Sequence, residues 1–352
     1  MTARPASRSG RAHRILAVDP CTDRRWERFA TGATGSLFTS PPWLRAVCRT
    51  YGFAARARLA VSAEGALCGG LAWVPVDDLR GRRRVSLPFS DRADPAGEPA
   101  VVAALLDDGA AGTPWTLRAL EPTPLTAVPG VVETGRAAWH ATPLDGDLAD
   151  LRARLHHQPR RNVAVAARRG VRVRRAPGVA GARAVHALHV RRRKERYRLL
   201  APPARLFEEI VTAFGDDTVV ALLAEVDGEV VAGALFLEWD GVLYYKFGAS
   251  RAEALALRPN DALFWAGIAH GVGRGLRALD WGVSDLDQPG LVAYKDRWAT
   301  HRRTVVTART GPPVPSTGVD ALLTSVTAWL TEPGVPDTVT ARAGSELYRY
   351  FC

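Results

Sequence analysis

Lysine is scarce in this sequence, and one lysine lies where a fixed positive charge could act in catalysis. Of the 47 basic residues, only Lys194, Lys246 and Lys295 are lysines. An ammonium group is a compact charge with three donors, which suits a developing oxyanion or a phosphate group. Lys295 is therefore a candidate catalytic residue. The competing interpretation is a surface ion pair with Asp287 or Asp296.

Three aspartates are candidates for the base that would take a proton from a nucleophile. They are Asp91, Asp280 and Asp285, and the sequence does not choose among them. Asp91 follows a β-rich run, residues 82–87, and lies beside Ser90 in a loop. An aspartate in such a loop usually forms a turn or caps a helix, so Asp91 has this structural interpretation as well.

The stretch of residues 219–300 contains the elements that would position these side chains. It holds three β-rich runs separated by Asp-Gly dipeptides, which are the strongest short-range signal for a meander of hairpins. Asn260 or Asp261 can cap the apolar helix that follows, and a further strand begins at Leu279. The three runs are residues 219–226, 229–239 and 242–250.

A similar hairpin in the first half indicates a repeated architecture. Aligning its Glu64-Gly65 turn with Asp227-Gly228 places Gly70 on Gly233, with apolar strands on both sides in each copy. A supersecondary unit that recurs in both halves indicates two related α/β domains, and a length of 352 residues favours two domains over one. Residues 100–147 are predicted to alternate short strands with Pro and Gly, and residues 142–146 mark the boundary.

The chain is strongly basic, with a formal net charge of +11. This charge indicates an anionic partner such as nucleic acid, a phosphorylated substrate or a membrane surface. Arginines gather in two predicted helical segments, and each segment is either a solvated face or a contact with a polyanion. The first, residues 148–170, includes Arg160 and Arg161, and the second, residues 191–198, includes Arg191 and Arg192.

The sequence predicts a soluble, cytoplasmic protein. No apolar run reaches the roughly 18–20 residues of a membrane span, and the N-terminus lacks the apolar core of a signal peptide. The four cysteines show neither metal-ligand spacing nor a dense disulfide pattern, and the eight histidines suggest no metal site. A basic face can still rest on the anionic inner face of the membrane.

Several segments between residues 40 and 304, most clearly those after Leu148, together resemble a known family. The sequence is similar to the peptidoglycan bridge-forming aminoacyltransferases of the Fem type, which pair two acetyltransferase-like (GNAT) domains. The segments that carry the resemblance are Arg160-Arg161-Asn162, His189 to Arg193, Val231 to Leu237, Tyr244 to Ser250, Leu257-Arg258-Pro259-Asn260, Asp280-Trp281-Gly282 and Gly290 to Lys295.

The resemblance implies an α/β (α+β) fold of two tandem GNAT-like domains, each a mixed, mostly antiparallel sheet flanked by helices. The C-terminal segment is expected to return and pack on the first domain. The expected division is a disordered basic tail of residues 1–14, a first domain of residues 15–145 plus 311–352, and a second domain of residues 146–310 with the catalytic cleft.

The resemblance also implies a reaction. An amine acceptor would attack the ester carbonyl of an aminoacyl-tRNA, which is a co-substrate, so no cofactor is expected. The acceptor would be a peptidoglycan precursor, which can be lipid-linked, or a small biosynthetic amine. The expected catalytic residues are Lys295, Tyr294, Asp280 and Asp91, and the expected RNA-binding residues are Arg160, Arg161, Arg191 and Arg192.

The expected substrate-binding residues include a departure from the family. The helix predicted over residues 43–50 begins with Trp43, whose competing interpretation is a buried anchor of the core. The family often has Trp-x-x-x-Lys here, but this chain has Val47 at the lysine position and offers Arg45 or Arg49 instead. The full set is Trp43, Arg45, Tyr244, Tyr245, Lys246, Arg193 and Tyr197, the last two one helical turn apart.

Two other functions compete with aminoacyl transfer. An acyl-CoA N-acyltransferase of the same fold would cradle pyrophosphate in a glycine-rich loop at a helix N-terminus, but residues 251–260 contain no glycine. The glycines of residues 271–275 fall at the opposite end of that helix, where the dipole disfavours anions. The third alternative is a non-catalytic protein that binds RNA or a membrane surface through its arginines.

Overall fold

The predicted meander is present in the second half of the chain. Its strands are β8 (Val219–Val226), β9 (Glu229–Trp239) and β10 (Val242–Ser250), hydrogen-bonded in that order. Both connecting Asp-Gly dipeptides have positive φ at each residue, 51° and 82° at the first and 45° and 70° at the second. These values match the tight hairpin turn whose twist suits flanking strands, which explains why Asp-Gly occurs at both turns.

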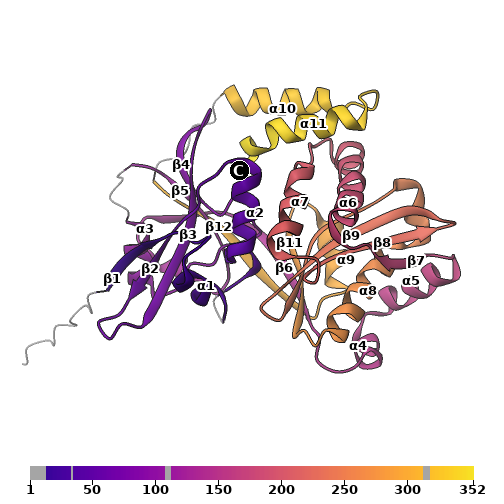
Figure 1. Cartoon of the computed structure of the whole chain (residues 1–352), viewed down its shortest axis with the longest axis horizontal. Helices are drawn as coiled ribbons and strands as arrows, with labels where there is room; N and C mark the ends of the chain where they lie inside the picture. Colours follow the sequence, from indigo (N-terminus) through magenta and orange to yellow (C-terminus); the bar gives the residue numbers. More distant parts are fainter. Residues whose placement is uncertain (1–12, 33–34, 108–111, 312–317) are drawn as a thin grey trace, which may run out of the picture.

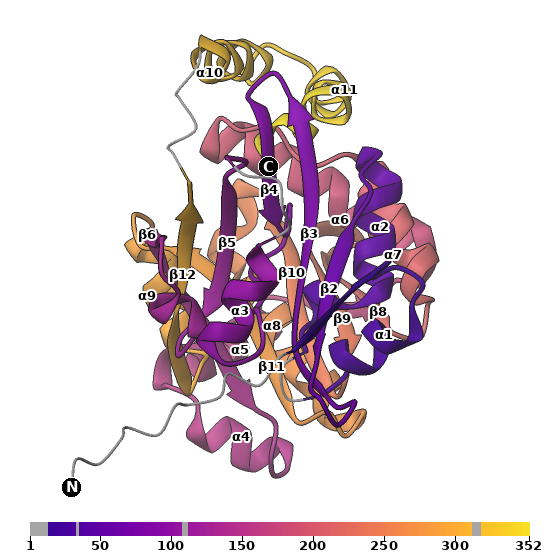
Figure 2. The same ribbon diagram turned by 90° about the vertical axis from the view of Figure 1, so that its left-hand side faces the viewer.

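All strands belong to one twelve-stranded sheet in this computed structural model, which describes residues 13–32, 35–107, 112–311 and 318–352 (Figures 1 and 2). Its order is β1-β2-β3-β4-β5-β12-β6-β11-β10-β9-β8-β7. The remaining strands are β1 (Arg14–Val18), β2 (Arg56–Val61), β3 (Leu67–Asp78), β4 (Gly81–Ser86), β5 (Trp115–Leu120), β6 (Val131–Pro143), β7 (Arg172–Arg175), β11 (Ala278–Asp285) and β12 (His301–Thr310).

The two halves of the sheet repeat one pattern. In each half three antiparallel pairings are followed by one parallel pairing, β4 with β5 and β10 with β11. The next strand of each half crosses over, so β6 pairs with β11 and β12 pairs with β5. Strands β6 and β12 also pair with each other and join the halves. The predicted mixed, mostly antiparallel α/β fold is confirmed.

Helices occupy equivalent places in both halves. Helices α1 and α2 lie between β1 and β2, as α6 and α7 lie between β7 and β8, and α3 precedes β5 as α8 precedes β11. The helices are α1 (Arg24–Ala30), α2 (Pro41–Tyr51), α3 (Pro99–Leu106), α4 (Leu148–Arg154), α5 (His157–Arg168), α6 (Gly178–Arg192), α7 (Ala204–Phe214), α8 (Pro259–Gly273), α9 (Pro289–Asp296), α10 (Gly318–Leu330) and α11 (Asp337–Leu347).

Helix α3 corrects the sequence analysis, which expected short strands over residues 100–147. The helix is short and strongly apolar, and Val101, Val102 and Leu105 are buried. A short apolar run does not distinguish a buried helix from a buried strand by its periodicity. Strands β5 and β6 do lie in the rest of that stretch.

The predicted correspondence of Gly70 with Gly233 has a physical reason. A Cβ atom on Gly70 would lie 2.4 Å from the ring of Phe29, which belongs to α1. A Cβ atom on Gly233 would lie 3.1 Å from Val185, which belongs to α6. Each glycine therefore lets the covering helix approach its hairpin closely.

The central hydrophobic core joins the two halves. Helix α2 of the first half packs against α7 of the second, and its Trp43 and Val47 share one cluster with Phe207 and Ile210. That cluster also includes Tyr244, on one face of β10. A second cluster, around Phe264 and Trp281, lies on the opposite face of β10. The strand β10 is thus buried on both sides.

The C-terminal segment contacts both halves, along the upper edge of Figure 1. On the first half Arg80 pairs with Asp320 at 2.7 Å, and Arg83 donates to the Cys352 carbonyl at 3.1 Å. On the second half Lys194 pairs with Asp337 at 2.9 Å. Packing on the first half was expected, and the second contact is additional. The division into domains stays a prediction, the basic tail lies mostly outside the described residues, and Arg14 belongs to β1.

None of the helices in the described part of the chain is both long enough and apolar enough to cross a membrane.

Candidate active site

The parallel strands β10 and β11 part after a short contact. Only three residue pairs join them, of which Tyr244 with Asp280 is the last. Each strand has a β-bulge next to this point, with Lys246 as the extra residue of β10 and Trp281 as the extra residue of β11. A bulge redirects side chains, and here Lys246 and Phe247 both lie on the face of β10 that carries Tyr244.

A carboxylate from the first half bridges the parted strands. Asp91 accepts a hydrogen bond from the Lys246 ammonium at 2.6 Å through Oδ1, and from the backbone N–H of Val283 at 3.3 Å through Oδ2. The side chains of Lys246 and Asp91 are 9% and 19% exposed. The ion pair therefore closes the gap between β10 and β11 and fastens the first half to it.

Gly282 makes this bridge possible. Its φ is +72°, and a Cβ atom here would lie 2.7 Å from Oδ2 of Asp91. Any side chain would be strained by the backbone and would collide with the carboxylate. The Asp280-Trp281-Gly282 motif thus contributes its glycine to the Asp91 contact.

Aromatic rings line the other side of the Lys246 ammonium. Its nitrogen lies 4.8 Å from the Phe38 ring centroid and 5.1 Å from that of Trp43, distances at which a cation is attracted to a ring face. Trp43 is fully buried, and its indole N–H donates to the Ser90 hydroxyl at 2.9 Å. The interpretation of Trp43 as a core anchor is confirmed, and its proposed contact with substrate stays a prediction.

Lys295 joins the same centre from α9. Its ammonium donates to the Val283 carbonyl at 3.1 Å, so Lys295 and Asp91 contact the same residue of β11. Lys295 is 4% exposed. Burial lowers its pKa to about 8, and the Lys246 charge acts in the same direction, while the carboxylates of Asp91 and Asp280 oppose the shift.

The interpretation of Lys295 as a surface ion pair is wrong. Lys295 is buried, and the neighbouring carboxylate of Asp296 pairs instead with His140 at 2.9 Å and with Arg302 at 3.2 Å. Asp285 lies exposed at the end of β11, where its charge helps to keep Lys295 protonated.

Two of the three candidate bases, Asp91 and Asp280, have opposite electrostatic environments. Burial alone would raise the pKa of Asp91, but the Lys246 ammonium, with Lys295 and Arg118, lowers it. Burial raises the pKa of Asp280, which accepts only from the Trp139 indole at 2.9 Å and the Gly282 N–H at 2.7 Å among the described partners. Asp91 is held ionised, whereas Asp280 binds a proton more readily.

Asp280 also faces a hollow of about 550 Å³ between the two halves. Tyr244, Trp139 and Arg92 lie around it, and Arg92 pairs with Asp94. The hollow is lined by Gly32, Gly35, Arg92, Trp139, Ala141, Asp240, Val242, Tyr244, Arg277, Ala278 and Asp280.

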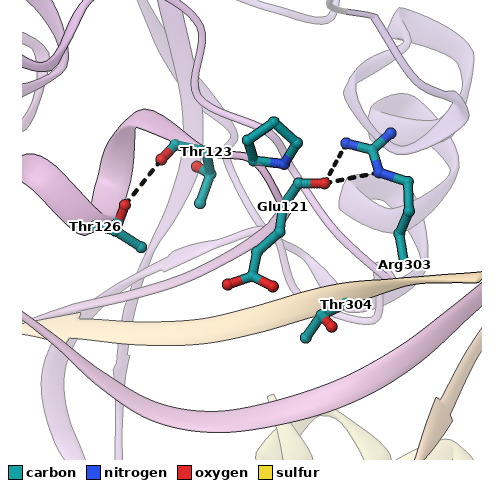
Figure 3. Close-up of a pocket in the computed structure, with 6 residues that line it drawn as sticks. Glu121, Thr123, Thr126, Arg303 and Thr304 are labelled. Atoms are coloured by element: carbon teal, nitrogen blue, oxygen red, sulfur yellow. Dashed lines mark hydrogen bonds between the residues drawn. The ribbon is translucent and has the colours of Figure 1, made fainter.

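A second hollow, of about 510 Å³, lies at Glu121, Arg303 and Thr304 (Figure 3). Its Arg303 donates to the Glu121 carbonyl and places its guanidinium 5.9 Å from the Trp139 ring centroid. The lining also includes Pro122, Thr123, Thr126 and Thr304. It contains none of the candidate catalytic residues, so the reaction is expected elsewhere.

The predicted tyrosines lie on both faces of β10. Tyr244 packs against Phe38 on the face of Lys246. Tyr245 lies on the opposite face, 4.9 Å from Phe264 between ring centroids, and Tyr294 packs on Phe264 as well, at 5.4 Å. Burial raises the pKa of both Tyr245 and Tyr294. Tyr294 and Lys295 are adjacent in sequence but have different partners, the Phe264 ring for Tyr294 and the Val283 carbonyl of β11 for Lys295.

The N-terminus of α8 carries a carboxylate of its own. Asp261, in the first turn, is buried and accepts from Asn162 at 3.2 Å and from the Tyr294 hydroxyl at 3.5 Å. Pro259, at the first helical position, has no N–H to donate. The segment before the helix is a 3₁₀ turn (Ala252–Leu257) that ends at Arg258 in the left-handed conformation.

Other predicted site residues lie away from this centre. Arg45 donates to the Cys21 carbonyl at 2.9 Å. Arg193 and Tyr197 belong to a π-helical turn rather than an α-helix, and they have different neighbours, Tyr348 for Arg193 and Arg192 for Tyr197. Their shared ligand stays a prediction.

The predicted RNA-binding arginines occupy two surfaces. Arg160 and Arg161 are exposed on α5. Arg191 pairs with Glu195 at 2.8 Å at the end of α6. In the same cluster Lys194 and Arg198 bind the C-terminal segment, so part of this basic cluster serves the fold.

Sequence analysis missed Trp139, Arg92 and Arg118 around the two aspartates. They lie in the first half and on β6, far in sequence from the motifs of the second half. No spacing pattern connects such residues: Trp139 reaches the site through the pairing of β6 with β11, Arg118 lies on β5, and Arg92 is next to Asp91 in the loop after β4.

Comparisons with known proteins agree with this architecture. Residues 149–296 match the family model of the acetyltransferase (GNAT) domain. No curated protein matches the chain significantly in sequence. The match supports a GNAT-type acyltransferase fold for this stretch, which contains Lys246, Asp280 and Lys295.

Three solved structures show the similarity of the whole fold. FemX shares 17% identity over 83% of this chain and 96% of its own, with a TM-score of 0.64. A tandem GNAT protein from the clavulanic acid biosynthesis pathway, solved without AcCoA, shares 14% over 86% and 100%, with a TM-score of 0.51. A conserved protein of unknown function from Bacteroides thetaiotaomicron shares 12% over 76% and 88%, also at 0.51. At these identities the likeness concerns the fold alone.

Proposed function

We propose that this protein transfers an amino acid from an aminoacyl-tRNA to an amine acceptor and forms a new amide bond. The GNAT-type domain supports acyl transfer, and the resemblance of the motifs to Fem-type enzymes supports aminoacyl-tRNA as the donor. The acceptor, a peptidoglycan precursor or a smaller amine, and a location in the cytoplasm at the membrane face belong to the same proposal.

The observation that carries the choice of donor is the N-terminus of α8. An acyl-CoA enzyme would direct free N–H groups at this end toward pyrophosphate. Here Pro259 lacks an N–H, and Asp261 places a buried carboxylate where an anion would have to lie. Burial raises the pKa of Asp261, but its ionised form would repel pyrophosphate, which supports a donor other than coenzyme A.

Lys295 suits the proposed chemistry. The amine nitrogen forms a bond to the ester carbonyl carbon, and the bond from that carbon to the ribose oxygen breaks. The ribose oxygen takes up the proton that the attacking nitrogen loses. In between, negative charge develops on the carbonyl oxygen, and a buried ammonium such as Lys295 would stabilise it.

A donor competition tests the proposal. Thermal unfolding is followed with a non-hydrolysable aminoacyl-tRNA analogue, with the same RNA uncharged, and with acetyl-CoA, all at one moderate salt concentration. We expect stabilisation by the aminoacylated RNA beyond that by the uncharged RNA. Stabilisation by acetyl-CoA alone would refute tRNA as the donor.

The Lys295→Ala variant separates catalysis from binding. We expect a rate loss of about 10²- to 10³-fold, because one stabilising group of the oxyanion is removed, with RNA affinity nearly unchanged. The wild-type rate should also fall above about pH 8, where Lys295 loses its proton. A protein that only binds RNA would show neither effect.

The double variant Arg160→Ala/Arg161→Ala is the reverse control, because it should weaken RNA binding and flatten its salt dependence.

An acyl-CoA-dependent N-acyltransferase is the second candidate. Arg258 favours it: burial raises the pKa of Asp261 and the positive charge of Arg258 opposes that shift, so a cation lies near this helix end and could contact a phosphate. Binding of acetyl-CoA that is lost in Arg258→Ala would support this alternative.

A further inference from the structure

One acidic and one basic side chain lie near the floor of the hollow around Asp280. Asp280 is buried and lines the hollow together with Arg92. The positive charge of Arg92 lowers the pKa of Asp280 against the effect of burial, so the two groups lie within electrostatic reach of each other. The rings of Trp139 and Tyr244 line the same hollow.

The charged side chains at the rim of the hollow already form an ion pair with each other. Asp240 accepts from Arg277 at 3.3 Å and from the backbone N–H of Gly32 at 3.3 Å. On the floor, the donors to Asp280 among the described residues are two neutral N–H groups, and Arg92 pairs with Asp94 through one end of its guanidinium. The Nε atom of Arg92 is buried and has no hydrogen-bond partner among the residues that the structure describes. Buried polar atoms without partners indicate where a ligand or water completes a site.

We propose that this hollow is the acceptor site and that its ligand is a small zwitterionic amine, with the ammonium at Asp280 and the carboxylate at Arg92. The inference rests on the proposed function, since it names the acceptor of the same reaction. A volume of about 550 Å³ is in the range of sites for small molecules. Two arginines and two aspartates line the hollow, so it offers no net positive charge to a diphosphate-linked precursor.

The same placement assigns the base. The Asp280 carboxylate accepts a proton from the acceptor ammonium, and the neutral amine then attacks the ester carbon. Burial raises the pKa of Asp280, which improves it as a proton acceptor near neutral pH. Asp91 is less suited, because its carboxylate is engaged with Lys246 and Val283.

The binding of small ligands in the absence of aminoacyl-tRNA tests the proposed acceptor site. Ligand-observed NMR and calorimetry compare the zwitterions glycine, β-alanine and 4-aminobutyrate with ethanolamine, acetate and pyrophosphate. We expect at least one zwitterion to bind about tenfold more tightly than ethanolamine or acetate. Failure of all three zwitterions to bind, or tighter binding of pyrophosphate, would overturn the inference.

Variants place the ligand in the hollow. Asp280→Asn should weaken zwitterion binding about tenfold or more, because an ionised partner is lost. Ala278→Leu fills the hollow without removing a polar contact and should abolish binding while thermal unfolding stays near that of the wild type. The matched carboxylate control, Asp77→Asn, changes an exposed residue of β3 and should bind normally. Zwitterion binding that survives both Asp280→Asn and Ala278→Leu would refute the site.

The two proposals fail separately. If zwitterions bind through Asp280 but no aminoacyl-tRNA stabilises the protein, the acceptor site stands and the proposed donor fails. If an amino acid passes from tRNA to another amine and no zwitterion binds, the donor stands and the zwitterion site fails.

Discussion

The two halves of the sheet share one order of strands and differ at their parallel pairs. Each pair extends over three residue pairs, the last of which is Ser86 with Leu117 in the first half and Tyr244 with Asp280 in the second. Leu117 is fully buried in an apolar cluster, whereas Asp280 is a buried carboxylate beside a hollow. The same point of the repeated scaffold is core in one half and candidate active site in the other.

The strands also continue differently beyond these pairs. In the first half β4 ends at Ser86, and the chain that follows carries Asp91 to the gap of the second half. In the second half β10 continues through Lys246 to Ser250. Buried charges cost free energy unless they are paired. The Asp91 carboxylate of the first half therefore stabilises the Lys246 and Lys295 ammonium groups of the second. The candidate site thus lies at the parallel pair of the second half, with Asp91 supplied by the first half.

Of the variants considered, removal of the Lys246 side chain should lower the stability of the protein most. In Lys246→Ala the buried Asp91 carboxylate loses its ion-pair partner, and we expect a loss of about 3 kcal/mol in the free energy of unfolding, measured with urea. The control Arg82→Ala removes an exposed pair with Asp77 and should change little. The double variant Lys246→Met/Asp91→Asn should recover part of the loss, and no recovery would contradict a role of the unpaired charge.

Alanine at Gly282 should have the next largest effect. We expect Gly282→Ala to cost at least about 1 kcal/mol more than Gly228→Ala in the free energy of unfolding. Both glycines have positive φ, so both variants carry backbone strain of about 1 kcal/mol. Only at Gly282 would the new Cβ meet Asp91, because no atom lies within 4 Å at Gly228. Equal losses would show that the Asp91 contact is unimportant.

The pH dependence of stability should distinguish the two carboxylates by sign. Asp91 has a lowered pKa, so its contribution is present above its unfolded pKa, near 3.8, and is lost as pH falls through the folded pKa. Asp280 has a raised pKa, so its ionisation destabilises the fold as pH rises from about 3.8 through the folded pKa. Each effect is at most about 1.4 kcal/mol per pH unit.

The variants Asp91→Asn and Asp280→Asn test this difference. Relative to the wild type, Asp91→Asn should become less stable as pH rises through its window, and Asp280→Asn should become more stable. Thermal or urea unfolding between about pH 2 and pH 7 measures both, because the window of Asp91 lies below pH 3.8 and that of Asp280 above it. Differences of the same sign in the two variants would show that the environments of Asp91 and Asp280 are not opposite.

Removing one indole donor should have the smallest effect. Trp139→Phe deletes the N–H that binds the Asp280 carboxylate, so the pKa of Asp280 should rise further and stability should fall by about 1 kcal/mol. Trp26→Phe is the matched variant, since the buried Trp26 indole donates to the neutral Thr39 carbonyl. It should lower stability similarly without moving the pH dependence. A shift in the pH dependence of Trp26→Phe would contradict the assignment.

The sequence alone predicted the elements of the second half because their signals are local. Asp-Gly turns determine the bounds of β8, β9 and β10, since few dipeptides adopt two consecutive positive φ values. The sequence alignment of Gly70 with Gly233 predicted a repeated hairpin, and each glycine lies beneath a helix in the structure. The apolar run of α3 was misassigned because such a run fits either a buried strand or a buried helix.

The sequence by itself also singled out Lys295, Lys246, Asp91 and Asp280 by residue type and motif. It could not place Asp91 against Lys246 or Trp139 against Asp280, because 155 and 141 residues separate these partners. Only the exchange of β6 and β12 and the bulges in β10 and β11 bring them together. The tertiary structure thus decided which carboxylate is paired and which faces a hollow, since burial and neighbouring charge, and not residue type, set the state of an aspartate.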